Sequence, residues 1–142
     1  MAEALLRLAH LTRDNDYADT ARETLSSFVT DYKRYGHFVA GYGRAVDLLF
    51  HEPVHVTIVG SRSDEATRTL AEAALRPYVA SRIVQLIDPG EDVELLNRSG
   101  LPAPRSASEP PRAYVHRGRE SYAETSDPVR LPALMTRTER GS

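Results

Sequence analysis

Cysteine is absent from the 142-residue sequence, and so are long apolar runs. Without a thiol, the chain can form no disulfide, cysteine nucleophile, Cys-X-X-Cys redox centre or cysteine-ligated zinc site. No run approaches the roughly 18 apolar residues that span a bilayer, so we expect no membrane segment. The amphipathic start, with Glu3 among leucines, lacks the unbroken apolar stretch of a signal peptide, which favours a cytoplasmic location.

A strong charge of one sign is absent too. Eighteen basic residues against twenty acidic ones give a net charge of −2, which provides no electrostatic argument for nucleic acid as a partner. Lys33 is the only lysine, and the other basic residues are arginines scattered along the chain. This bias indicates a GC-rich, bacterial genome more than a phosphate-binding surface.

The composition that remains, 41% hydrophobic and 27% charged residues, is typical of a globular protein. Apolar residues at helical spacing predict a helix over residues 2–11 and another over 16–29, which together form an antiparallel αα-hairpin. Asp14 or Asp16 can cap the second helix through its side-chain oxygen. The same spacing predicts a third helix over residues 38–50.

The apolar period changes from helical to alternating after residue 53. Residues 54–60 are rich in β-branched side chains and predict a strand, which a helix over 64–76 and a second strand over 82–87 follow. Strand, helix and strand over this length are typical of one parallel βαβ unit.

The remaining segments predict a closing strand and a terminal helix. Residues 88–111 contain five of the nine prolines and predict an irregular loop, and residues 112–118 predict a third strand. A helix capped by Asp127 should be short, because Pro132 lies inside it.

These elements predict an α+β, mixed fold: a helical hairpin and third helix packed with a small βαβ-containing sheet. We expect a helical segment over residues 1–52, the βαβ segment with its closing strand and short helix over 53–135, and a polar tail over 136–142, all forming one compact unit.

The turn after the first strand is a candidate anion site. Free N–H groups at the start of the following helix, together with its dipole, could hold an anion near Ser61, Arg62 and Ser63. Neither standard glycine-rich phosphate loop is present. An ordinary capped turn between strand and helix is the favoured interpretation.

Aromatic and basic residues gather in residues 31–44, where they could stack on and hydrogen-bond a sugar or a base. The candidate ligand-binding residues are Tyr35, His37, Tyr42 and Arg44. A connection between helices, with the aromatic side chains used for packing, is the favoured alternative.

Histidine spacing does not favour a metal site, because none of the five histidines falls in an H-x-x-x-H or H-E-x-x-H pattern. His116, Glu120 and Ser121 resemble a nucleophilic triplet, but alternate residues of a strand point to opposite faces. We therefore expect no metal site, no cofactor and no catalytic residue.

Residues 56–88 and 110–131, preceded by the helical residues 41–53, resemble the C-terminal end of one family. It is the thioredoxin-domain-containing family related to spermatogenesis-associated protein 20, in which an (α/α)6 toroid similar to N-acylglucosamine 2-epimerases follows a thioredoxin-like domain. The closing strand resembles the family pattern A-Y-V-C, four residues, C, and then T-D-P-x-x-L. The matching residues here are Ala113, Tyr114 and Val115, and approximately Ser126, Asp127, Pro128 and Leu131.

The family's two cysteine positions fall on His116 and Ser121, and its thioredoxin-like domain and most of its toroid have no counterpart here. The resemblance implies a non-catalytic scaffold or interaction domain. Its partner would be the remainder of a larger protein, another protein or a second copy of itself. Two alternatives stay open: a small carbohydrate-acting or sugar-binding protein, and an anion-binding regulatory module.

Overall fold

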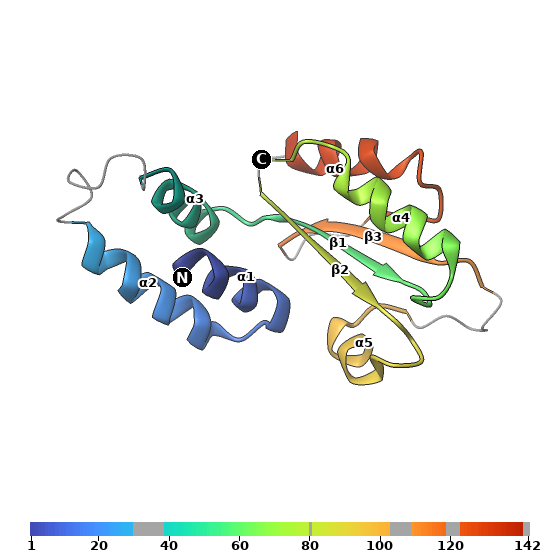
Figure 1. Cartoon of the computed structure of the whole chain (residues 1–142), viewed down its shortest axis with the longest axis horizontal. Coiled ribbons are helices and arrows are strands. Elements are labelled where there is room, and N and C mark those ends of the chain that lie inside the picture. The colour runs from blue at the N-terminus through green and yellow to red at the C-terminus, as the bar shows by residue number, and fades with distance from the viewer. Residues whose placement is uncertain (30–38, 80, 103–108, 119–122, 141–142) are drawn as a thin grey trace. The chain divides into compact units, whose positions relative to one another are not determined.

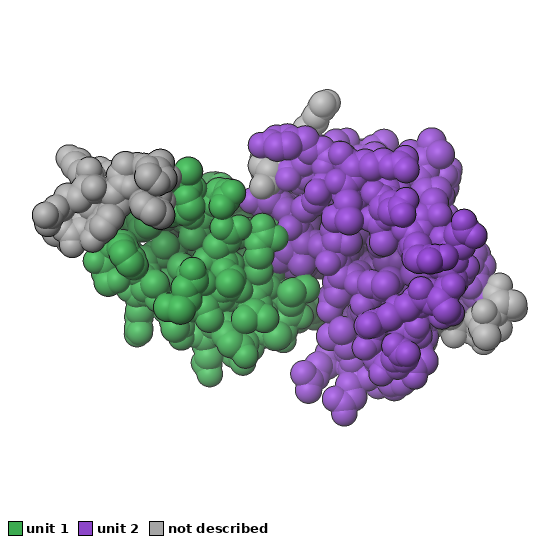
Figure 2. All heavy atoms as spheres, viewed as in Figure 1, with its two compact units in different colours: residues 1–53 green, residues 54–142 purple. Residues whose placement is uncertain are grey.

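The structure is a computed structural model, and it describes residues 1–29, 39–79, 81–102, 109–118 and 123–140. The chain divides into two compact units, Met1–Pro53 and Val54–Ser142 (Figure 2). Helices and strands together form an α+β, mixed fold, as the sequence predicts. Among the described residues, no helix has both the length and the apolar character needed to cross a membrane.

Over residues 1–29 and 39–53, the first unit consists of three helices: α1 (Ala2–Thr12), α2 (Asn15–Phe28) and α3 (Val39–Phe50). The side chain of Asp14 accepts a hydrogen bond from the backbone N–H of Asp16 at 3.0 Å and so caps α2, as predicted. The helices enclose a small core in which alanines allow close approach and three leucines provide most of the volume. Its buried members are Ala2, Leu6, Ala21, Leu25, Ala45 and Leu48.

The described residues of the second unit form a four-stranded sheet in the order β2-β1-β3-β4, in which β4 is the short strand Ala123–Thr125. Strands β1 (Val54–Val59) and β2 (Arg82–Ile87) are parallel, and α4 (Glu65–Leu75) joins them. Strand β3 (Arg112–Arg117) runs antiparallel to β1. The predicted βαβ unit and its closing strand are therefore confirmed.

Both faces of this sheet are covered by helices (Figure 1). On one face α4 and α6 (Leu131–Arg140) pack over alternate residues of β1 and β3, including Val56, Ile58 and Val115. On the other face α5 (Val93–Ser99) covers a smaller cluster. Its buried members are Val59, Ile87, Leu96 and Tyr114.

The C-terminal half differs from the sequence-based expectations in three places. Within residues 88–111, expected to be irregular, α5 forms a helix of 7 residues that ends at Gly100, whose φ of 69° suits a residue without Cβ. A short strand, β4 (Ala123–Thr125), pairs with β3 and was not expected. The last helix, α6, extends for 10 residues, because Pro132 is its second residue, where no intrahelical N–H bond is lost.

Asp127 precedes α6 in a turn instead of capping it directly. Its Oδ1 accepts a hydrogen bond from the backbone N–H of Val129 at 2.8 Å, and the helix begins at Leu131. The helix that the sequence predicts directly after Asp127 therefore begins later, at Leu131.

Candidate functional site

The carboxyl ends of the parallel strands β1 and β2 meet at one edge of the sheet, where α/β proteins commonly bind ligands. We call the two turns that follow these strands, residues 60–64 and 88–92, the crossover edge. The backbone N–H of Gly60 donates a hydrogen bond to the carbonyl oxygen of Ile87 at 3.1 Å and so holds the two turns side by side.

Asp88 occupies the centre of the crossover edge and is buried. Its Oδ2 accepts a hydrogen bond from the backbone N–H of Arg62 at 2.8 Å, and its Oδ1 accepts one from the backbone N–H of Gly90 at 2.9 Å. Both N–H donors lower the pKa of the Asp88 carboxyl below its usual value, and the N–H of Arg62 has the larger effect. Asp88 is therefore ionised at neutral pH.

Asp92 and Arg62 form the second contact across the crossover edge. The guanidinium Nη2 of Arg62 lies 2.6 Å from Oδ2 of Asp92, and the backbone N–H of Asp88 donates to that same oxygen at 3.0 Å. The Asp88 N–H and the Arg62 guanidinium lower the pKa of Asp92, and the hydrogen bond to Asp92 raises the pKa of Arg62. Both groups are therefore charged at neutral pH.

The three candidate anion-binding residues lie on the first turn of this edge, just before α4. The hydroxyl oxygens of Ser61 and Ser63 are 2.9 Å apart, and Asp64 caps α4 by accepting from the backbone N–H of Ala66 at 3.1 Å. The backbone N–H and the guanidinium of Arg62 both bind carboxylates of the chain itself. Anion binding stays a prediction, and an external anion would have to displace these carboxylates.

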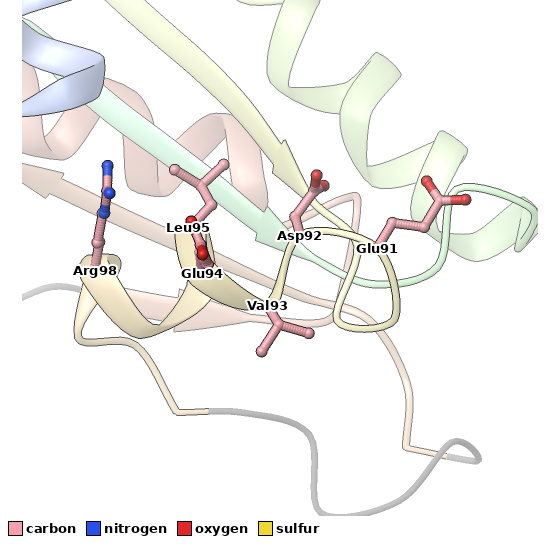
Figure 3. A pocket seen from close by; sticks show the side chains of 6 residues that line it. All are labelled: Glu91, Asp92, Val93, Glu94, Leu95 and Arg98. Carbon is pink, nitrogen blue, oxygen red and sulfur yellow. The ribbon is translucent and has the colours of Figure 1, made fainter.

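An open depression lies beside the second turn, over the start of α5 (Figure 3). Figure 3 shows Glu91 and Asp92 extending from the turn, with Val93 directed away from them. Three acidic side chains against one arginine make its lining negative, which disfavours an anionic ligand. The lining residues are Glu91, Asp92, Val93, Glu94, Leu95 and Arg98.

The aromatic and basic candidates for sugar binding are only partly described. Tyr35 and His37 lie outside the described residues. Tyr42 packs against the helical core, whereas Arg44 is exposed and its Nη2 lies 3.5 Å from Oε2 of Glu3. Two residues apart on α3, Tyr42 and Arg44 do not face each other, so they do not form one side of a pocket.

His116 of the suspected triplet lies in β3, while Glu120 and Ser121 lie outside the described residues. The structure instead pairs His116 with His55 of β1, which is its partner in the antiparallel register. Their rings are stacked, with centroids 5.0 Å apart and planes 12° from parallel. Histidine spacing could not reveal this pair, because it depends on the register of two distant strands.

Comparisons with protein-family models, curated proteins and solved structures found no match to this chain. The family resemblance of residues 56–88 and 110–131 accordingly stays a prediction.

Proposed function

We propose that the chain is a non-catalytic scaffold or interaction domain, resembling the end of a protein that combines thioredoxin-like and epimerase-like parts. Its partner in this proposal is the remainder of a larger protein, namely the helices that would neighbour the first unit in an α/α toroid. The proposed location is the cytoplasm.

The surface of the first unit carries this proposal. Phe50, at the end of α3, is 74% exposed, and Phe28, at the end of α2, is 48% exposed. Among the described residues, the buried core of this unit consists of three leucines and three alanines. Aromatic side chains left in water next to so small a core are typical of helices that pack against further helices.

The crossover edge supports a non-catalytic role. Its one arginine and its central N–H donors are engaged by Asp88 and Asp92, so the groups that would recognise a substrate anion serve to hold the two turns together. A sugar-binding function would depend on Tyr35 and His37, which lie outside the described residues.

Light scattering of the chain across a concentration series tests the proposal. Without its helical neighbours, the exposed side chains of Phe28 and Phe50 should promote self-association, so the measured mass should rise above that of a monomer. The double variant Phe28→Ser, Phe50→Ser should remain monomeric. Val129→Ser is the matched control, because it removes an exposed apolar side chain, 83% accessible, from the second unit.

A wild-type chain that stays monomeric at every concentration and behaves like the double variant would contradict the proposal. Self-association that Val129→Ser abolishes and the phenylalanine variant does not would place the interacting surface on the second unit, and would equally refute it.

A further inference from the structure

We propose that His55 and His116 form a binding site for a borderline transition-metal cation, with Zn²⁺ as the representative ion. The site joins β1 and β3 within the second unit and is separate from the crossover edge. Imidazole is a preferred ligand of Zn²⁺, Cu²⁺ and Ni²⁺, and water molecules would complete the coordination of a site with two protein ligands.

The pairing of the two strands brings the histidines together. His55 and His116 are directly opposite each other in the antiparallel register, so both side chains project from the same face of the sheet. Both side chains are partly buried, so each ring has little rotational freedom to lose when a metal binds. The backbone thus provides two imidazoles from two separate strands at a fixed spacing.

The ring spacing suits a tetrahedral ion. A bond of about 2.0–2.1 Å plus a ring radius of about 1.1 Å places zinc about 3.2 Å from each ring centroid. The ring centroids are 5.0 Å apart. The lines from the two centroids to the metal, along which the N–Zn bonds lie, then form an angle of about 103° at the metal, near the tetrahedral angle. The stacked rings must rotate about their Cβ–Cγ bonds to converge, and this torsion has a broad energy profile.

The backbone next to His116 favours one tautomer of its ring. Nδ1 of His116 lies 3.2 Å from the carbonyl oxygen of Gly118, a distance at which a protonated Nδ1 donates to that oxygen. In this tautomer the lone pair that can bind a metal is on Nε2. Histidine ligands commonly donate their second ring N–H to a backbone carbonyl in this way, which fixes the tautomer.

Calorimetric titration of the whole chain with ZnCl2 tests the site, with MgCl2 as the negative control because Mg²⁺ prefers oxygen ligands. We expect saturation at one zinc per chain and no binding of magnesium. His55→Asn and His116→Asn should each lower the zinc affinity by at least about tenfold, since losing even a group that only orients a ligand costs about 10–100-fold.

The matched control is His51→Asn, which removes an exposed histidine whose Nδ1 lies 2.9 Å from Asp47 in the first unit. It should leave the zinc affinity unchanged. A second measurement needs no variant: in NMR spectra of the wild-type chain, zinc should shift the ring-proton signals of both His55 and His116 together.

Three results would overturn the proposal. The first is the absence of saturable zinc binding to the wild-type chain. The second is binding that His55→Asn abolishes but His116→Asn preserves, which would assign the ion to a different ligand set. The third is a spectrum in which zinc shifts neither ring, whatever the calorimetry shows.

Discussion

Replacing Gly60 with alanine introduces a methyl group where β1, α4 and the start of β3 meet. A Cβ at this position would lie 2.5 Å from Oγ1 of Thr67 and 2.6 Å from Cβ of Pro111. Both distances are far below the 3.5–4.0 Å at which non-bonded carbon atoms attract each other. Gly60 does not have a positive φ, so the expected cost comes from these contacts and not from the backbone conformation.

The loss of stability in Gly60→Ala depends on how far Thr67 and Pro111 can move away from the added methyl group. Thr67 is fully buried and β-branched, so rotating its hydroxyl away brings its methyl group into the same space. Pro111 belongs to a rigid ring. Overpacking of this kind costs about 1–3 kcal/mol, and reduced freedom of the unfolded chain offsets about 0.4–1 kcal/mol. We expect a net loss of about 1–2 kcal/mol in the stability of the second unit.

Residue-resolved hydrogen exchange measures this loss, because the β1 amides report the second unit and the α3 amides report the first. Gly43→Ala is the matched control. Nothing lies within 4 Å of a Cβ at Gly43 in α3, so alanine there should stabilise the first unit by up to about 1 kcal/mol. If β1 in Gly60→Ala exchanges as slowly as in the wild type, the tight contact inferred at this turn does not exist.

Three further predictions concern the two units. The stability that Asp88 and Asp92 contribute should be fully present above the unfolded carboxyl pKa of 3.8 and lost as the pH falls through their lower folded values, because the ionised carboxylates accept these N–H bonds more strongly than the protonated groups do. Acid titration of unfolding by circular dichroism checks this, and an Asp88→Asn, Asp92→Asn variant with the same acid dependence would disprove it. Leu6→Ala should destabilise the first unit by about 2–5 kcal/mol, whereas Leu8→Ala, at an exposed position of the same helix, should change its stability by less than about 0.5 kcal/mol. Asp64→Ala should cost about 0.5–2 kcal/mol by removing the cap of α4, and equal β1 exchange rates in the variant and the wild type would contradict it.

The βαβ unit could be predicted because several independent signals agree along residues 54–87. Both strands are rich in β-branched residues, and the Asp64 cap marks the start of the helix between them. Pro77 prevents that helix from continuing toward β2. Where local preference and apolar spacing agree in this way, tertiary contacts rarely change the secondary structure that they predict.

Helix α5 was missed because seven residues are too few to display a helical period. Gly100, one residue after its end, was the available signal, since glycine commonly terminates a helix in the left-handed region. In α6, Pro132 was interpreted as a breaker, although proline is tolerated in the first turn of a helix. In both cases the position of a residue within the helix decides its effect.

The contacts of the crossover edge could be predicted only in part. The sequence predicts a turn after each parallel strand, and with it the positions of Arg62 and Asp88. It does not predict that the Asp88 carboxylate accepts from the Arg62 N–H, because this depends on the alignment of Val59 with Ile87. The pairing of His55 with His116 depends in the same way on the register of β1 and β3.

The hydrogen bonds of the crossover edge bear directly on where this chain can bind another molecule. An anion arriving there would have to compete with two carboxylates that are ionised at neutral pH and already hold the N–H groups of Arg62, Asp88 and Gly90. The net free energy of binding such an anion is small, because each hydrogen bond that it forms replaces an existing one. Phe28 of α2 and Phe50 of α3 are exposed, so burying their side chains against a partner displaces water and breaks no hydrogen bond that the described part of the chain shows. Recognition through the helices of the first unit is therefore favoured over recognition through the edge of the sheet.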